Sequence, residues 1–142
     1  MIQARDKVYA DLLACGQRNE TYSLIHADLL PDNILIEDKT IRIIDFDDAG
    51  FGWHQFELAT VLINYLGTDQ FDMARDALIS GYRRERDLSD ETLSFLPLFF
   101  LARALTWVGW SFTRYETETA QAVRPLVIGL ACGLAEDYLS SG

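Results

Sequence analysis

The feature that most constrains this chain is a pair of short apolar runs, 34–36 and 41–44, joined through a polar turn at 38–40. Isoleucine-rich runs on either side of a polar turn are typical of a β-hairpin. Because the two ends of a hairpin lie close together, we expect the polar residues that flank it to converge on one site. Oxygen donors there suit Mg²⁺, which keeps several waters and relies on substrate phosphates. The flanking residues are His26, Asp28, Asn33 and Asp45.

The length and charge of the chain limit what it can be. Its 142 residues are enough for one domain with its own core, and no linker-like stretch divides them, so we expect a single domain over 1–142. The net charge of −10 argues against nucleic acid as a partner, because a phosphate backbone attracts clustered Lys and Arg. The same charge permits a cationic substrate, and it is equally consistent with general solubility.

The cysteines and the apolar stretches indicate the compartment. Cys15 and Cys132 form neither a disulfide framework nor a zinc motif, and we expect both to be small buried residues in a reducing environment. The N-terminal residues are polar, unlike a secretory leader. The longest apolar stretch, 95–109, is interrupted by Arg103 and is shorter than the ~20 residues that a membrane span needs. We therefore expect a cytoplasmic protein with no membrane segment.

Around the hairpin, the spacing of apolar residues predicts mainly helix. A small β cluster cannot form a core alone, so we expect it to pack on these helices in an α+β, mainly helical fold. Residues 46–54 are expected to be an irregular loop because of Gly50 and Gly52. The other expected elements are a helix at 2–18, a strand at 22–25, and helices at 55–67, 70–86 with Asp69 as N-cap, 90–114 with Ser89 as N-cap and a break near Pro97, and 118–140 across Pro125.

Short motifs occur in a fixed order around the hairpin. They are His26-Ala-Asp28-Leu-Leu-Pro-Asp-Asn33 before it, Ile44-Asp45-Phe46-Asp47-Asp48-Ala49-Gly50 after it, and then Phe56-Glu57-Leu58-Ala59. Their order and spacing resemble the aminoglycoside phosphotransferase/choline kinase family, small-molecule relatives of the protein kinases. The resemblance covers residues 25–60, and the later helices match in type only. It implies a protein-kinase-like C-terminal lobe and an ATP-dependent O-phosphotransferase that acts on a small-molecule hydroxyl.

The resemblance also implies a role for each site residue. Asp28 is the expected catalytic residue, as base or orienting carboxylate for the acceptor hydroxyl. Asn33 and Asp45 are the expected ligands of the Mg²⁺ that bridges the nucleotide phosphates. His26 is expected to brace the loop by a hydrogen bond to the backbone near Asp45. Glu57 is expected to anchor the loop through backbone N–H groups, although Asp is commoner at that position.

Three residues near these motifs keep open roles. Asp47 and Asp48 are candidates for a second metal ion or for contact with a cationic acceptor, and the alternative is a solvated loop or a helix cap. His54 receives no role. Neither the acceptor nor the choice between ATP and GTP is indicated.

A complete member of this family also has an N-terminal lobe with a phosphate-covering loop, a Lys and its partner Glu. Only 25 residues precede His26, and they contain no Gly-rich loop. We therefore expect the C-terminal lobe alone, with little turnover of its own and an exposed lobe surface that favours self-association. The alternative is a non-catalytic binding or dimerisation module. A metal-dependent hydrolase is a weaker alternative, because no further His–carboxylate ligand set is present.

Overall fold

The computed structural model describes residues 1–141, which form two compact units. Residues 17–96 make the first, here called the site unit because it contains the hairpin and every candidate site residue. Residues 1–16 and the chain from Pro97 onward make the second, here called the helical unit. The expectation of a single domain over 1–142 stays a prediction.

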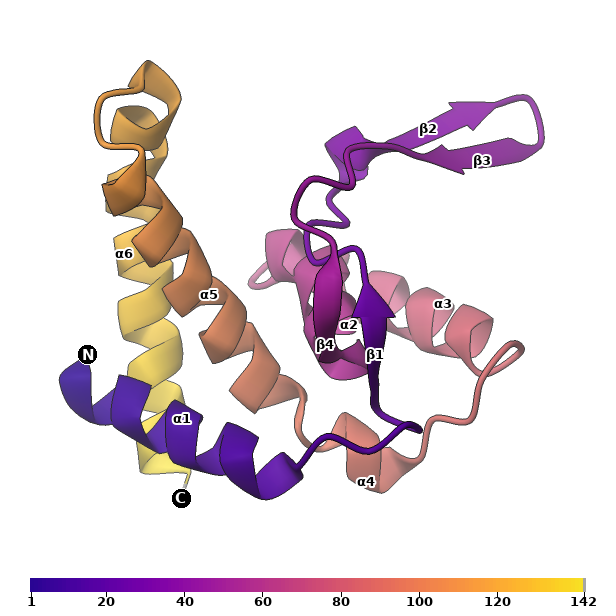
Figure 1. The fold of residues 1–142 in the computed structure, drawn as a ribbon, viewed down its shortest axis with the longest axis horizontal. Coiled ribbons are helices and arrows are strands. Elements are labelled where there is room, and N and C mark those ends of the chain that lie inside the picture. The colour runs from indigo at the N-terminus through magenta and orange to yellow at the C-terminus, as the bar shows by residue number, and fades with distance from the viewer. Residues whose placement is uncertain (142) are drawn as a thin grey trace. The chain divides into compact units, whose positions relative to one another are not determined.

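Four short strands of the site unit form two separate antiparallel ribbons (Figure 1). β1 (Tyr22–Ile25) pairs with β4 (Gly50–Trp53), and we call this pair the β1–β4 ribbon. β2 (Ile34–Glu37) and β3 (Thr40–Ile43) form the predicted hairpin. Asp38 in its turn has φ 54°, a left-handed conformation that Asp tolerates better than most residues.

β4 shows that the expectation of an irregular loop over 46–54 was wrong for its second half. Glycine lowers the propensity of a segment for strand, which is why the sequence alone favoured a loop. In the ribbon, however, Gly52 lies opposite Ser23, and a Cβ added to it would lie 2.5 Å from Cδ1 of Ile25. This glycine therefore permits close packing within the ribbon.

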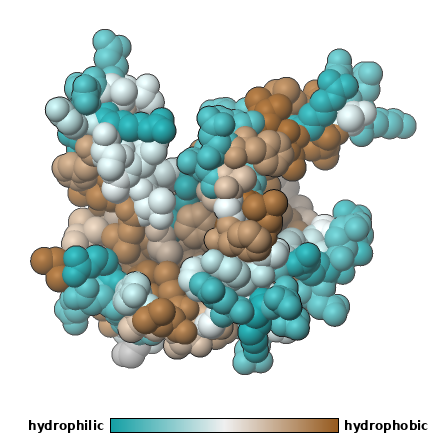
Figure 2. All heavy atoms as spheres, viewed as in Figure 1, coloured by the Kyte–Doolittle hydropathy of each residue, from teal (hydrophilic) through white to brown (hydrophobic). Residues whose placement is uncertain are grey.

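The hairpin exposes apolar side chains along both strands. Figure 2 shows apolar residues gathered over it, at the upper right of the view. Ile36 and Ile41 lie opposite each other and are 74% and 67% exposed. An exposed apolar surface of this kind is typical of an interaction site.

Helices complete the site unit. α2 (His54–Leu62) contacts both strands of the β1–β4 ribbon and continues into the 3₁₀ turn η2 (Ile63–Tyr65). α3 (Phe71–Tyr82) and α4 (Asp90–Leu93) follow. The side chain of Ser89 caps α4 as predicted, by accepting from the backbone N–H of Thr92 at 3.0 Å.

α3 is shorter than the predicted helix over 70–86. Its N-cap is Gln70 rather than Asp69, because the chain makes a turn just before it, with the N–H of Phe71 bonded to the carbonyl of Thr68. At its other end, the side chain of Arg83 donates to the carbonyl of Leu88 at 2.9 Å. Arg83, Arg84 and Arg86, which fall within the predicted helix, therefore lie in the turn that follows α3.

The helical unit consists of α1 (Ile2–Cys15), α5 (Leu96–Thr113) and α6 (Glu118–Ser140). α1 contacts α6, where Tyr138 donates to the carboxylate of Asp11 at 2.6 Å. α5 and α6 are linked by a 2.7 Å hydrogen bond from Arg124 to the carbonyl of Ser111. The break before Pro97 is present as predicted, and Pro125 lies inside α6.

The structure bears on two expectations about the apolar parts of the chain: the burial of the cysteines, which needs correction, and the absence of a membrane segment, which stays a prediction. Cys15 and Cys132 are half-buried rather than buried, and neither forms a disulfide within the described chain. By length and composition alone, Asp90–Thr113 is long and apolar enough to cross a membrane. This is weak evidence for a span, because the core helix of a soluble protein passes the same test.

Candidate active site

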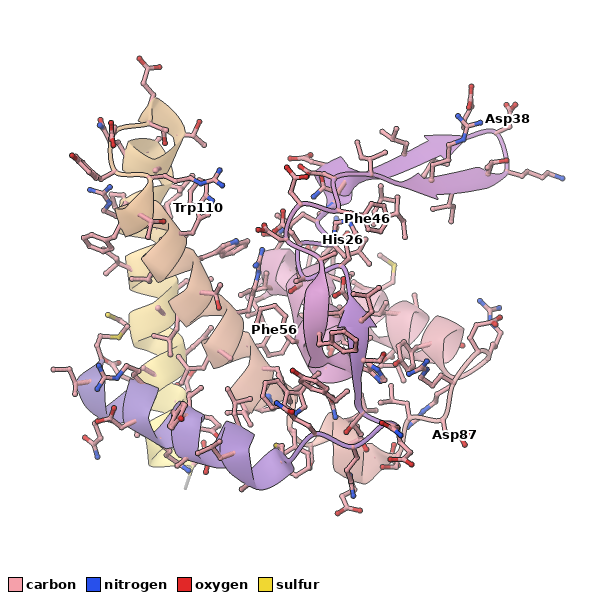
Figure 3. All side chains as sticks on the ribbon, viewed as in Figure 1. His26, Asp38, Phe46, Phe56, Asp87 and Trp110 are labelled. Carbon is pink, nitrogen blue, oxygen red and sulfur yellow. The ribbon has the colours of Figure 1, made fainter. Side chains whose placement is uncertain are left out.

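The loop over residues 26–33, between β1 and the hairpin, is held at its start by His26. The imidazole Nε2 lies 2.8 Å from the carbonyl oxygen of Ile44, and the backbone N–H of Asp28 donates to Nδ1 at 3.3 Å. Because a carbonyl only accepts and an amide N–H only donates, His26 is neutral and carries its proton on Nε2. The ring also lies 4.7 Å from that of Phe46 (Figure 3). His26 thus links the end of β1 to the end of β3.

Glu57, in the first turn of α2, holds the next residue of the loop. Ala27 has φ 66°, a conformation that residues other than glycine rarely adopt. Its backbone N–H donates to Oε2 of Glu57 at 2.9 Å. This is the type of contact that the family resemblance implied for an acid at this position. The strained peptide is therefore fixed by a charge-assisted hydrogen bond from a helix that packs on the β1–β4 ribbon.

The structure brings Asp28 and Asn33 together. The side-chain amide of Asn33 donates to the backbone carbonyl of Asp28 at 2.8 Å and to its carboxylate Oδ2 at 3.3 Å. Asn33 ends the 3₁₀ turn η1 (Pro31–Asn33), which folds the loop back toward Asp28. Since the NH₂ group of Asn33 is used in this way, its Oδ1 remains as an acceptor.

The acidic residues after the hairpin are more exposed. The backbone N–H of Ile44 donates to the carbonyl of Asn33 at 3.1 Å, so Asp45 follows directly after a residue bonded to the loop. Asp45 has φ 62° and an exposed side chain. Asp47 and Asp48 are exposed in the next turn, and within residues 1–141 no hydrogen bond or ion pair holds their side chains.

These donors fit a metal ion that is bound together with a nucleotide. Among residues 1–141, no group of three or more His, Cys, Asp or Glu side chains is placed to hold a metal ion. The carboxylate of Asp45 and Oδ1 of Asn33 are two hard oxygen donors from the two ends of the hairpin. Mg²⁺ typically takes one or two protein carboxylates and completes its shell with phosphates and water. The donor set therefore suits that mode of binding better than an all-protein cage.

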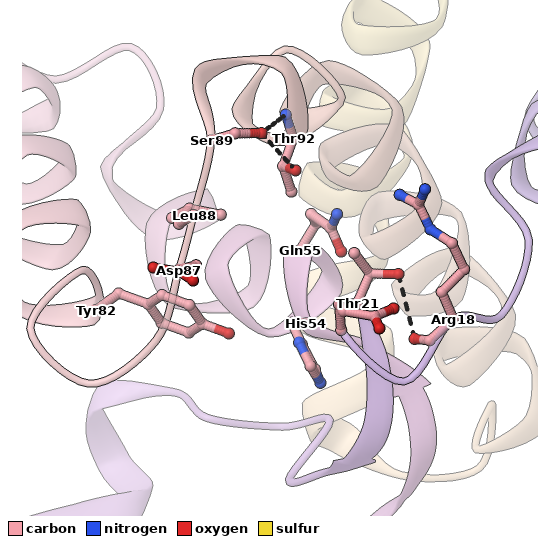
Figure 4. Close-up of a pocket in the computed structure, with 10 residues that line it drawn as sticks. Arg18, Thr21, His54, Gln55, Tyr82, Asp87, Leu88, Ser89 and Thr92 are labelled. Atoms are coloured by element: carbon pink, nitrogen blue, oxygen red, sulfur yellow. Dashed lines mark hydrogen bonds between the residues drawn. The ribbon is translucent and has the colours of Figure 1, made fainter.

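A pocket of about 280 Å³ lies in the same unit and is lined by His54 and Gln55 among others (Figure 4). Burial, followed by the positive charge of Arg86, lowers the pKa of His54, while a hydrogen bond to the backbone of Glu20 opposes this shift. The sequence assigns no role to His54 and does not distinguish Gln55 from other residues at a helix start. Polar residues at the start of a helix are too common to signal a pocket.

Comparison with known proteins identifies relatives of this chain. The sequence profile of the Phosphotransferase enzyme family matches residues 1–92. A homoserine kinase of Sinorhizobium fredii (strain NBRC 101917 / NGR234) is 33% identical over 103 residues, which are 64% of this chain and 32% of that protein. An amicoumacin kinase of Bacillus subtilis (strain 168) is 24% identical over 131 residues, which are 84% of this chain and 38% of that protein. The chain thus spans about a third of the length of the curated relatives it matches.

Solved structures of two small-molecule kinases have the same fold as this chain. A microcompartment-associated aminopropanol kinase superposes with a TM-score of 0.83 at 30% identity, covering 99% of this chain and 44% of that one. The amicoumacin kinase hAmiN, solved with AMP-PNP, Ca²⁺ and Ami, superposes with a TM-score of 0.76 at 21% identity, covering 96% and 44%. The predicted fold class is confirmed: the chain has a kinase-like, mainly helical fold with small antiparallel ribbons.

Proposed function

This chain belongs to the phosphotransferase enzyme family, and from that premise we propose that it is the catalytic lobe of an ATP-dependent O-phosphotransferase. The reaction transfers the γ-phosphoryl group of ATP to a hydroxyl of a small molecule. Phosphoryl transfer requires little covalent chemistry from the protein and depends on positioning and on neutralisation of charge. The proposal therefore depends on whether the loop that carries Asp28 is rigid.

The observation that carries the proposal is the set of hydrogen bonds around Asp28. Its backbone N–H is bonded to His26, its carbonyl to Asn33, and the preceding peptide N–H to Glu57. Fixing both peptide groups of a residue restricts the directions in which its side chain can point. A loop that served only as a surface turn would not need three side chains from separate elements to hold its backbone.

In the proposed mechanism, Asp28 accepts a hydrogen bond from the acceptor hydroxyl and orients its oxygen toward the phosphorus. General-base assistance of this kind contributes about 10²–10⁴-fold in rate. The hydrogen bond from Asn33 to Oδ2 of Asp28 holds the carboxylate in position for the hydroxyl. Asn33 thus connects the acceptor side of the site to the metal side.

Asn33 and Asp45 would hold Mg²⁺, which supplies neutralisation of the charge on the transferred phosphoryl group. The amide oxygen of Asn33 and the carboxylate of Asp45 would bring one negative charge to the ion, which leaves half of its charge for the phosphates. Asp47 and Asp48 are exposed beside this site and are candidates for a second metal ion or for a cationic acceptor.

The acceptor class that we propose is a small alcohol that carries an amine. Aminopropanol and homoserine, which name two of the relatives, are both alcohols with an amino group. The chain carries a net charge of −10. Exposed carboxylates lie next to the loop over residues 26–33, which we call the catalytic loop. A protonated amine near these carboxylates would be attracted to the site and oriented in it.

The test is ATP turnover by the complete gene product in the presence of Mg²⁺ and a panel of amino alcohols. Asp28→Asn removes the charge of the base and is expected to lower kcat by 10²–10⁴-fold. Asp45→Asn keeps a residue that tolerates a positive φ and is expected to raise the Mg²⁺ concentration needed for half-maximal turnover.

Asp38→Asn is the matched control, because Asp38 also has a positive φ and lies at the tip of the hairpin (Figure 3). It should leave turnover unchanged. Undiminished turnover in both Asp28→Asn and Asp45→Asn would overturn the proposal.

A second candidate function is a binding or dimerisation module without catalysis, and the exposed apolar hairpin favours it. The two functions differ in their response to ligand. A catalytic lobe is expected to melt at a higher temperature with Mg²⁺ and AMP-PNP, because a ligand that binds only the folded state stabilises it. A non-catalytic module would not respond to nucleotide, and its sedimentation would show self-association that depends on the hairpin.

A further inference from the structure

The 280 Å³ pocket of the site unit lies away from the catalytic loop. Thr21, which precedes β1, lines it, whereas His26 follows β1 at the other end. A strand rises about 3.3 Å per residue, so these two positions are roughly 16 Å apart. We propose that this pocket binds a small zwitterion of the α-amino acid class, with its ammonium group at Oε1 of Gln55 and its carboxylate facing Arg18.

Gln55 is the observation that points to a ligand. Its side chain lines the pocket and the residue is only 5% exposed. Oε1 is buried and has no hydrogen-bond partner among residues 1–141. A buried polar atom without a partner costs free energy, so natural structures rarely retain one unless a ligand or an ordered water satisfies it. What Oε1 requires is a hydrogen-bond donor, and an ammonium group provides three.

The charges around the pocket suit a ligand with both signs of charge. Figure 4 shows Arg18 and Asp87 on opposite sides of the pocket, with Gln55 between them. Neither Arg18 nor Asp87 forms an ion pair with another residue of the described chain. A small zwitterion with its carboxylate facing Arg18 and its ammonium group at Gln55 would direct its positive charge toward the side of the pocket that Asp87 lines. Glu20, which also lines the pocket, adds a second acidic side chain and so favours the ammonium group.

His54 lines the pocket with an uncharged side chain. Nη1 of Arg86 lies 3.0 Å from Nε2 and 3.2 Å from Nδ1 of the imidazole. Because an arginine only donates, this contact needs an imidazole nitrogen with a free lone pair, which a neutral ring has. The pocket therefore contains no cationic histidine that would repel an ammonium group.

The size of the pocket limits the ligand. Pockets for drug-sized molecules span about 300–1,000 Å³, and this one lies just below that range. This size suits a small amino acid better than a nucleotide. The hydroxyls of Thr21, Tyr82 and Thr92 also line it and would contact polar atoms of the ligand.

The experiment uses the ¹⁵N-labelled chain and three related probes, L-alanine, ethylamine and propionate. Ethylamine lacks the carboxylate of L-alanine, and propionate lacks its ammonium group. None has a hydroxyl, so none is a phosphoryl acceptor and the outcome is independent of the proposed function. L-alanine is expected to shift the side-chain amide signals of Gln55 and the backbone signal of Thr21, with each of the other probes binding at least tenfold more weakly.

Variants place the binding in this pocket. Gln55→Met keeps the size of the side chain and removes its polar group, and Arg18→Met removes the guanidinium at an exposed position. Each is expected to weaken L-alanine binding at least tenfold. Arg42→Met on the hairpin is the matched control and should leave binding unchanged, as should Asp28→Asn in the catalytic loop.

The proposal is overturned if L-alanine leaves the Gln55 and Thr21 signals unshifted, since the pocket then holds water only. Equal binding of ethylamine or of propionate overturns the assignment to a zwitterion. Binding that Asp28→Asn weakens and Arg18→Met does not would place L-alanine in the catalytic site and overturn the proposal as well. If Gln55→Met fails to fold, Arg18→Met decides the question, because Arg18 is exposed.

Discussion

The two ribbons of the site unit have the same length and the same antiparallel pairing but differ in their surroundings. The β1–β4 ribbon is bonded to α2 through the backbone N–H of His54, which donates to the carbonyl of Thr21 at 2.9 Å, and through a 2.7 Å contact between Ser23 Oγ and His54 Nε2. The β2–β3 hairpin exposes almost every residue of its strands. Pairing alone therefore does not determine rigidity, because an isolated two-stranded ribbon is only marginally stable in water.

The catalytic loop lies between the anchored ribbon and the exposed hairpin. His26 and Glu57 connect the loop to the end of β3 and to α2, and Asn33 is bonded to Ile44 on the hairpin side. We infer that the position of Asp28 is set mainly from the side of the ribbon and α2. The following predictions test this difference between the two ribbons, from the largest expected effect to the smallest.

His26→Leu should have the largest effect, because it removes the link between the two ribbons. The carbonyl of Ile44 and the N–H of Asp28 both lose their bond to the imidazole in a partly buried site. We expect a loss of ~2–4 kcal/mol in the free energy that protects the amides of Asp28 and Ile44 from hydrogen exchange.

The His26→Gln variant is the control, since a glutamine side chain replaces one of the two hydrogen bonds. It should recover part of this loss. Unchanged protection of both amides in His26→Leu would show that the hairpin is held by other contacts.

Glu57→Leu should have the next largest effect, because it removes the acceptor for the strained peptide N–H of Ala27. An unsatisfied, partly buried N–H costs about 1–3 kcal/mol. Hydrogen exchange at Ala27 measures this loss of protection. We also expect a lower kcat, with little change in the melting of the hairpin. Glu57→Gln keeps an uncharged acceptor and should lose about half as much; equal losses in the two variants would contradict the role of the hydrogen bond.

Lowering the pH should loosen the β1–β4 ribbon before the hairpin. The pKa of His54 in the folded chain is below its ordinary value of 6.5, so the unfolded chain binds more protons between these two values. The contribution of neutral His54 to stability is complete above pH ~6.5 and decreases as the pH falls through the folded pKa, by at most ~1.4 kcal/mol per pH unit. Hydrogen exchange of Tyr22 and Ser23 between pH 8 and pH 5 measures this slope.

His54→Gln should remove that slope while leaving the exchange of the hairpin amides as it was. A slope that persists in this variant would assign the acid sensitivity to another group.

The same comparison shows how far the sequence predicts this fold. The hairpin was predictable because its signals are local, namely isoleucine runs on either side of a turn. The motif residues Asp28 and Asn33 were predictable as neighbours, because they share one loop. β4 was not, since the role of Gly52 depends on Ile25, which is distant in sequence and near only in the folded chain. The buried, unsatisfied Oε1 of Gln55 was not predictable either, because its burial depends on tertiary packing that a polar residue at a helix start does not reveal.

The smallest effect on stability is expected for the double variant Ile36→Thr, Ile41→Thr. These side chains lie opposite each other on the hairpin but are already mostly exposed, so replacing them should cost less than ~0.5 kcal/mol in free energy of unfolding. Because they form part of the exposed apolar surface, the variant should also reduce self-association in sedimentation experiments.

The matched comparison is Ile63→Thr, the same substitution in the 3₁₀ turn after α2. Ile63 is only 3% exposed, so burying a hydroxyl there in place of an ethyl group should cost ~1–3 kcal/mol. If the hairpin variant loses as much stability as Ile63→Thr, the hairpin strands must be covered in the folded protein in solution. The two ribbons would then differ in what covers them and not in how rigid they are.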